Sequence, residues 1–147
     1  MTKPILREKT DGEVWNVFGE KIICKVTGAE TFGRFSVVEE TSSPQSVVPP
    51  HFHHETDEII YVLEGRYEFQ IDGKLQIAGK GDMVVIPRQT RHGFRNLLAT
   101  ESKLLAVVTP SGFENFFAEI SRLSPNQLKD PANIAAIGRR NDLELAR

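Results

Sequence analysis

Short segments with alternating apolar and polar residues dominate the first three quarters of the chain. Each segment is rich in β-branched and aromatic side chains, and glycines, prolines or turn residues separate it from the next. The segments are residues 13–18, 21–26, 34–40, 58–64, 83–86 and 103–108. Strands that recur at intervals of about ten residues, without intervening helices, are typical of an antiparallel sandwich or barrel. The pattern therefore predicts an all-β fold.

Residues 66–78 predict a β-hairpin around Asp72-Gly73, and its register has two solutions. A two-residue loop would align Phe69 with Gln76, which mixes apolar and polar positions on one face. A three-residue loop that begins at Ile71 would instead pair Phe69 with Leu75 and Tyr67 with Ile77. We expect the three-residue loop, because it gives one apolar and one polar face.

Helices are predicted only after the strands, over residues 111–138. Ser111 and Glu114 have the spacing of a capping box, and a phenylalanine-rich stripe follows. Asp130-Pro131 is expected to begin a further helix that ends at Gly138, and residues 139–147 are expected to fray. The stripe consists of Phe113, Phe116, Phe117 and Ile120. We expect it to pack on the outer wall of the strands, the alternative being a mobile lid over a pocket.

Length and composition fit one domain that spans residues 1–147, with 39% hydrophobic and 26% charged residues. A net charge of -2 argues against a nucleic-acid partner, and no apolar run is long enough to cross a membrane. Residues 1–10 lack the apolar core of a secretory signal, so a cytoplasmic location is expected. Cys24 is the single cysteine and is expected to be a small buried side chain. Residues 14–18 and 21–26 look too apolar for one small barrel to cover, which favours a homodimer.

The four histidines fall in two clusters, at residues 51–54 and at His92. His51 and His53 are two residues apart and would project from the same face of a strand, whereas His54 would face the opposite way. A third imidazole from His92 and a carboxylate would complete a site of three nitrogens and one oxygen. Glu58 and Asp57 are both candidates for that carboxylate.

Residues 50–65 and 81–96 resemble the two motifs of the cupin superfamily. The first motif reads His-x-His, four residues, Glu, six residues and Gly, and the second reads Gly, five residues, Pro-x-Gly, two residues, His, three residues and Asn. The matching positions are His51, His53, Glu58, Gly65, Gly81, Pro87, His92 and Asn96. One position departs, because Gln89 stands where the family prefers glycine. The spacing of the family selects Glu58 over Asp57 as the carboxylate ligand.

The resemblance implies a double-stranded β-barrel of the jelly-roll class, with a core at about residues 34–109 and helices at about residues 111–138. It also implies one divalent transition metal (Fe, Mn, Ni, Cu or Zn) held by three imidazoles and the carboxylate. Asn96 is expected to bond the backbone of a turn, and Trp15 to lie in the core or in a dimer interface. A single barrel followed by a phenylalanine-bearing helix is similar to small bacterial proteins described as quercetin dioxygenase-like.

Strand parity predicts an apolar, aromatic substrate cavity beside the metal. Its expected lining residues are Ile60, Val62, Tyr67, Phe69 and Phe94. Such a cavity suits a small substrate that presents oxygens to the metal, such as an enediol, a β-diketone or a flavonol. We therefore expect an oxidoreductase of dioxygenase type in which Glu58 is both a ligand and a proton shuttle. The alternatives are a Lewis-acid isomerase or lyase acting on a sugar-like acid, and a non-catalytic protein that binds a small ligand.

Overall fold

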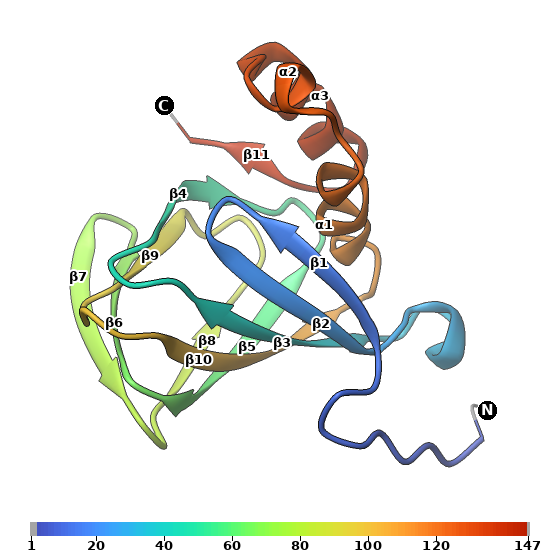
Figure 1. Cartoon of the computed structure of the whole chain (residues 1–147), viewed down its shortest axis with the longest axis horizontal. Coiled ribbons are helices and arrows are strands. Elements are labelled where there is room, and N and C mark those ends of the chain that lie inside the picture. The colour runs from blue at the N-terminus through green and yellow to red at the C-terminus, as the bar shows by residue number, and fades with distance from the viewer. Residues whose placement is uncertain (1–2, 147) are drawn as a thin grey trace.

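The computed structural model describes residues 3–146 and consists of two antiparallel β-sheets that face each other (Figure 1). The six-stranded sheet has the order β1 (Glu13–Val17), β2 (Glu20–Val26), β3 (Ser36–Ser42), β10 (Ser102–Thr109), β5 (Asp57–Glu64) and β8 (Met83–Ile86). The five-stranded sheet has the order β11 (Glu144–Leu145), β4 (Val47–Phe52), β9 (His92–Asn96), β6 (Arg66–Ile71) and β7 (Lys74–Gly79). The predicted all-β jelly-roll fold is confirmed.

Alternation along the central strands fills the space between the sheets. On β10, each second residue from Ser102 to Val108 is buried, and the pattern on β5 is similar. Val108 is paired with Glu58 and Ala106 with Ile60, so both strands turn these residues to the same interior. The functional side chains on β5 therefore emerge from a wall that apolar packing already holds in place.

The N-terminal strands join the six-stranded sheet of the same chain. β1 pairs with β2, and β2 pairs with β3. A short 3-10 turn at Ala29–Thr31 connects β2 to β3. Trp15, Ile22 and Cys24 are buried in the core. Burial was predicted for Cys24, and for Trp15 it was one of two alternatives, the other being a dimer interface. Val14 and Phe18 remain exposed on this edge. The homodimer stays a prediction.

The hairpin between β6 and β7 has the two-residue loop, so the predicted three-residue register is wrong. Phe69 lies opposite Gln76, not Leu75, and Tyr67 lies opposite Ala78. Asp72 and Gly73 both have a left-handed backbone, with φ of 47° and 79°, which matches the right-handed twist of the flanking strands. β7 is an edge strand and both of its faces are largely exposed, so burial does not select the apolar face.

Three helices follow the strands: α1 (Glu114–Ser121), α2 (Pro125–Leu128) and α3 (Pro131–Arg140). Ser111 does not cap α1, contrary to expectation, although the Glu114 carboxylate accepts a hydrogen bond from the Gly112 N–H at 2.6 Å. The capping box lies instead at Ser124 and Gln127, on the unpredicted α2. Among residues 3–146, none of the helices combines the length and apolar character that crossing a bilayer requires.

The C-terminal segment is ordered up to residue 146, so the expected fraying from residue 139 is wrong for the described residues. α3 begins at Asp130-Pro131 as predicted, with the Asp130 side chain accepting the Ala132 N–H, but it continues past Gly138 to Arg140. A Cβ at Gly138 would lie 2.7 Å from the Leu143 carbonyl oxygen, so glycine permits the returning chain to pack closely. That chain then forms β11, which pairs with β4 (Figure 1).

Two glycines with similar backbones provide a matched test of packing at the end of β5. Gly65 and Gly73 have φ of 83° and 79°, but a Cβ at Gly65 would overlap Ser102 Oγ and lie 2.9 Å from Ser102 Cα, whereas a Cβ at Gly73 meets nothing within 4 Å. We expect Gly73→Ala to lower the free energy of unfolding by about 1 kcal/mol and Gly65→Ala by about 3 kcal/mol or more. Urea denaturation measures both, and equal losses would contradict the assigned crowding.

Candidate metal centre and cavity

Two strands of the five-stranded sheet bring the histidines together. Register along β4 and β9 shifts between Val48 and His51, which places His51 directly opposite His92. Pro49 and Pro50 tolerate this bulge because they have no amide hydrogen to pair. Gly93 permits the close approach, since a Cβ there would lie 2.7 Å from the Val48 carbonyl oxygen.

Each of the three buried histidines has one ring nitrogen fixed by a backbone carbonyl. The Nδ1 atom of His51 lies 3.0 Å from the Pro49 oxygen, that of His53 2.6 Å from the Asp142 oxygen, and that of His92 2.8 Å from the Thr90 oxygen. A carbonyl oxygen can only accept, so each Nδ1 carries the hydrogen and each Nε2 is left to face the interior. One ring nitrogen from each histidine lies within 4.8 Å of the other two.

Glu58 completes the cluster from the opposite sheet. Its Oε2 atom lies 2.9 Å from His92 Nε2, and its Oε1 atom lies 3.6 Å from His53 Nε2. Burial alone would raise the pKa of Glu58, but the hydrogen bond from His92 and the neighbouring imidazoles lower it to about 2. Burial would lower the pKa of His92, yet Glu58 raises it above its usual value. Burial and the charge of His92 lower the pKa of His51 to about 3.

This donor set fits a divalent transition metal. His53 Nε2 is buried and has no hydrogen-bond partner, which is costly unless another group uses its lone pair. Three Nε2 atoms oriented by Nδ1–H bonds to carbonyls, with a carboxylate beside them, are the arrangement that metal-binding histidines adopt. The residues that would hold the ion are His51, His53, Glu58 and His92, the four that the sequence predicts.

A contact that the sequence did not reveal orders this cluster from the C-terminal segment. Besides the Asp142 carbonyl that fixes His53, the Asp142 carboxylate accepts hydrogen bonds from the His54 N–H at 2.8 Å and from the Thr56 hydroxyl at 2.7 Å. It also accepts a bond from the Glu55 N–H at 3.1 Å. Asp142 has a left-handed backbone with φ of 59°. An isolated aspartate in a charged tail carries no sequence signal for this role.

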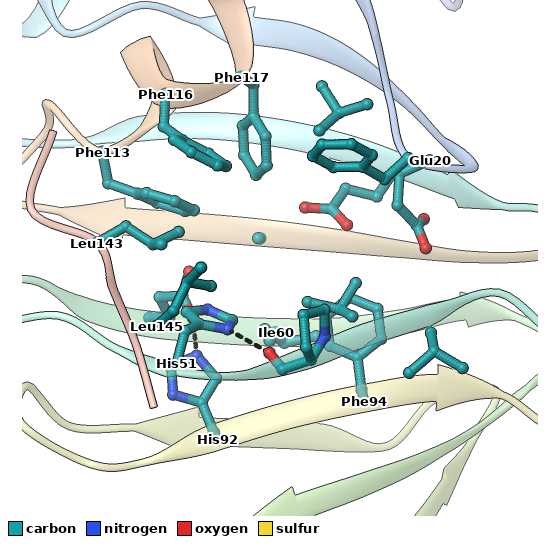
Figure 2. A pocket seen from close by; sticks show the side chains of 18 of the residues that line it. Glu20, His51, Ile60, His92, Phe94, Phe113, Phe116, Phe117, Leu143 and Leu145 are labelled. Atoms are coloured by element: carbon teal, nitrogen blue, oxygen red, sulfur yellow. Dashed lines mark hydrogen bonds and ion pairs between the residues drawn. The ribbon is translucent and has the colours of Figure 1, made fainter. Parts of the chain in front are cut away.

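A cavity of about 350 Å³ adjoins the histidine cluster. His51, His92 and Glu58 lie in its wall, and most of the remaining lining side chains are aliphatic or aromatic. Figure 2 shows three rings, from α1 and from the residue before it, above the cavity, and His51 and His92 below it. Those rings belong to Phe113, Phe116 and Phe117.

The position of these rings corrects the expectation that the phenylalanine stripe packs on the outer wall. The rings are buried in the wall of the cavity, and the ring centre of Phe113 lies 4.3 Å from that of His53. Ile120 is buried without lining the cavity. The helix therefore forms part of the wall of the cavity.

The predicted substrate-contacting residues fall into two groups. Ile60 and Phe94 line the cavity. Val62, Tyr67 and Phe69 are fully buried in the core and are not among the described residues that line it. Strand parity identified the interior face correctly, but it does not tell how far along each strand the cavity extends.

Residues near the motifs adopt supporting roles. His54 is exposed and pairs with Glu144 at 2.7 Å, as expected for a side chain on the opposite face. Asp57 bonds the Arg88 N–H at 2.8 Å and the Arg88 guanidinium, so it supports the turn before β9 and lies away from the histidines. Asn96 holds a turn through the Thr100 carbonyl at 2.8 Å. Gln89 adopts φ of 64°, so the turn keeps a left-handed residue without a glycine.

Two further acidic residues, neither predicted from the sequence, line the cavity. Glu20 and Glu40 are 5% and 7% exposed, at the start of β2 and on the inward face of β3. Burial raises the pKa of Glu20 to about 7, against the lowering effect of hydrogen bonds from Ser42 and Ser46. Figure 2 shows Glu20 well separated from His51 and His92.

Comparison with known proteins agrees with this architecture. A family model described as a cupin domain matches residues 38–108, which hold the histidines and Glu58. An uncharacterized protein of Aquifex aeolicus is 32% identical over 89 residues, which cover 60% of this chain and 69% of that relative. The chain belongs to the cupin family. Cupins typically bind a metal and act on small molecules, and three clustered histidines in this cupin agree with such a site.

Two further comparisons concern cupins with described activities. Quercetin 2,3-dioxygenase of Bacillus subtilis is 32% identical over 87 residues, which are 59% of this chain but only 26% of that relative. The crystal structure of the polyketide cyclase RemF from Streptomyces resistomycificus superimposes with a TM-score of 0.64 and 28% identity. That match covers 76% of this cupin and 81% of RemF.

Asp142 gives the first test of the cluster in this cupin. Asp142→Gly preserves the left-handed backbone and the carbonyl that fixes His53, but it removes the carboxylate that holds residues 54–56. We expect about a tenfold to hundredfold loss of metal affinity, as for other groups that support metal ligands. Glu144→Gln, which changes an exposed partner of His54, is the matched control. Competition with a chelator measures both affinities, and unchanged affinity in Asp142→Gly would refute the supporting role.

The raised pKa of Glu20 predicts a pH dependence of stability. In the folded protein the Glu20 carboxyl has a pKa of about 7, against 4.5 for a glutamate in the unfolded chain, so ionisation between these values favours unfolding. This contribution to stability is therefore present below pH 4.5 and is lost as the pH rises through about 7. As the pH rises from 4.5 to about 7, the free energy of unfolding of Glu20→Gln should increase by about 3 kcal/mol relative to that of wild type.

Urea denaturation over a pH series checks this expectation. Glu64→Gln, at an exposed carboxyl that is solvated in both states, is the control and should follow the wild-type curve. A Glu20→Gln curve parallel to wild type would contradict the assigned burial cost.

Proposed function

We propose that this cupin is a metal-dependent oxidoreductase of dioxygenase type, acting on a small aromatic or oxygen-rich substrate with an enolic or catecholic end. The observation that carries the proposal is the convergence of three Nε2 atoms and Glu58 beside a largely apolar cavity, with His51, His92 and Glu58 in its wall. Such a cavity excludes water from the reacting groups and strengthens every polar contact inside it. The partial match to quercetin 2,3-dioxygenase supports the choice of reaction.

Each residue of the cluster has a definable task in this proposal. His51, His53 and His92 would hold the ion with imidazoles whose orientation the carbonyl bonds fix. A divalent iron, manganese, nickel, copper or zinc ion would supply a Lewis acid that lowers the pKa of a substrate hydroxyl, and a redox-active ion would also aid reaction with dioxygen. Glu58 faces the same space and would accept the proton that the hydroxyl releases. The rings of Phe113 and Phe116 would hold an aromatic substrate by stacking or edge contacts.

A second candidate is a Lewis-acid reaction without oxygen, namely cyclisation of a poly-β-ketone. The specific observation in its favour is the similarity to the cyclase RemF over 76% of this chain. A β-diketone and a flavonol share an enolisable pair of oxygens, so the same cluster and the same proton acceptor suit both reactions. The two functions differ in whether dioxygen is consumed.

Adjacent histidines of opposite orientation provide the decisive variants. His53→Ala should lose stoichiometric metal while the barrel still folds, because His53 follows β4 and the apolar core between the sheets does not include it. His54→Ala, whose side chain is exposed, should keep the metal. Metal analysis, the melting midpoint and oxygen uptake with quercetin are measured on both variants and on wild type.

Oxygen uptake in wild type and His54→Ala, but not in His53→Ala, is the expected result. Turnover of a poly-β-ketone without oxygen uptake would favour the cyclase. Metal binding without turnover of either compound would indicate a cupin that binds a ligand without catalysis. Loss of folding in His53→Ala would indicate that the metal has a structural role.

A further inference from the structure

One carboxyl in the cavity wall has no partner among the residues that the structure describes. Glu40 occupies an inward position of β3, between buried Val38 and buried Ser42, and is 7% exposed. It lines the cavity. Within residues 3–146, its carboxyl makes no hydrogen bond and no ion pair. An apolar side chain at this position would pack without leaving a polar group to satisfy.

The neighbouring acid is different, because its oxygens are already used. Glu20 accepts hydrogen bonds from the Ser42 hydroxyl at 2.6 Å and from the Ser46 hydroxyl at 2.9 Å. Ser42 in turn lies 2.9 Å from the Tyr67 hydroxyl. Glu20 is thus part of a closed polar network that joins the two sheets, whereas Glu40 presents its carboxyl to the cavity.

Glu40 and the histidine cluster lie at different levels of the barrel. Along β10, Leu104 is paired with Glu40 and Val108 is paired with Glu58. Four residues of a strand correspond to roughly 13 Å. Apart from Glu20, the side chains that line the cavity between the two levels are apolar. The cavity therefore has two polar regions that an apolar stretch separates.

The carboxyl of Glu40 is suited to donate a hydrogen bond. Burial, and then the negative charges of Glu20 and Glu58, hold its pKa well above the usual range. A neutral carboxylic acid has an O–H donor, which in an apolar wall is most favourably used by a carbonyl or phenol oxygen.

We propose that Glu40 binds an oxygen of the substrate at the end opposite the one that faces the histidines. The inference rests on the proposed function and narrows its substrate class to elongated, largely apolar molecules with two oxygen-bearing ends. One end is the enolic or catecholic group that faces His51, His92 and Glu58. The other is a carbonyl or phenol group within reach of Glu40, and Glu40 thereby sets specificity and orientation.

Two flavonols that share the same 3-hydroxy-4-keto group form a matched pair of probes. Quercetin carries phenol groups on its outer rings, and 3-hydroxyflavone carries none. Their dissociation constants are measured without oxygen on the metal-loaded wild type and on the variants Glu40→Leu and Glu40→Gln. Metal content and melting midpoint are recorded for each protein, so a folding defect is recognised separately.

Wild type should bind quercetin about tenfold more tightly than 3-hydroxyflavone, the value of one hydrogen bond in an apolar site. Glu40→Leu should abolish this preference and leave the affinity for 3-hydroxyflavone unchanged. Glu40→Gln should retain the preference, because its amide N–H can donate in place of the acid. A purely packing role would not distinguish the two probes and would not be rescued by glutamine.

The remaining outcomes separate this inference from the proposed function. An equal preference in all three proteins, or its loss in Glu40→Gln as well as Glu40→Leu, overturns the role of Glu40 as a donor. The second result would indicate that an ionised Glu40 carboxylate accepts a hydrogen bond from a phenol O–H. If the preference depends on Glu40 but quercetin is not oxidised, the inference stands and the dioxygenase proposal fails. If neither flavonol binds wild type, both fail.

Discussion

Three backbone carbonyls determine the chemistry that this barrel can perform. By accepting the Nδ1–H of His51, His53 and His92, they turn the remaining nitrogen of each ring to one point in the interior. A freely rotating imidazole would lose conformational entropy on binding an ion, and these rings have lost it during folding. The apolar packing of the two sheets thus supports an arrangement that would be unfavourable in a flexible loop.

The same interior imposes a second constraint, because polar groups in it are few and each needs a partner. The cluster around Glu58 satisfies most of its own atoms, and the network of Glu20, Ser42 and Tyr67 does the same at another level. Among residues 3–146, buried Trp15 Nε1 and Ser36 Oγ have no hydrogen-bond partner and lie outside the wall of the cavity. His53 Nε2 in the cluster and the Glu40 carboxyl in the cavity wall also lack one. Both therefore identify places where a ligand could supply what the chain does not.

Sequence patterns predicted the sheets and the histidine cluster, but not the register of the hairpin or the contacts of the C-terminal segment. Period-two alternation and the spacing from His51 to His92 identified the sheets and the residues that meet, because inward-facing positions on paired strands are close in space. The hairpin register was mispredicted because Leu75 and Ile77 are exposed on an edge strand, where hydrophobicity does not fix the pairing. Asp142 was missed because its partners lie more than 80 residues earlier. The phenylalanine helix was recognised, but its docking site depends on tertiary geometry.

The return of the chain from α3 to β4 also has consequences for the order of assembly. His51, His53, Glu58 and His92 leave the ribosome well before residues 142–145, yet the carbonyl that fixes His53 belongs to Asp142. A nascent chain can therefore form the barrel and gather its imidazoles while one of them is still free to rotate. The His53 ring is fixed only once the following segment docks as β11, so an ion would meet three oriented imidazoles only after this part of the chain has closed on β4.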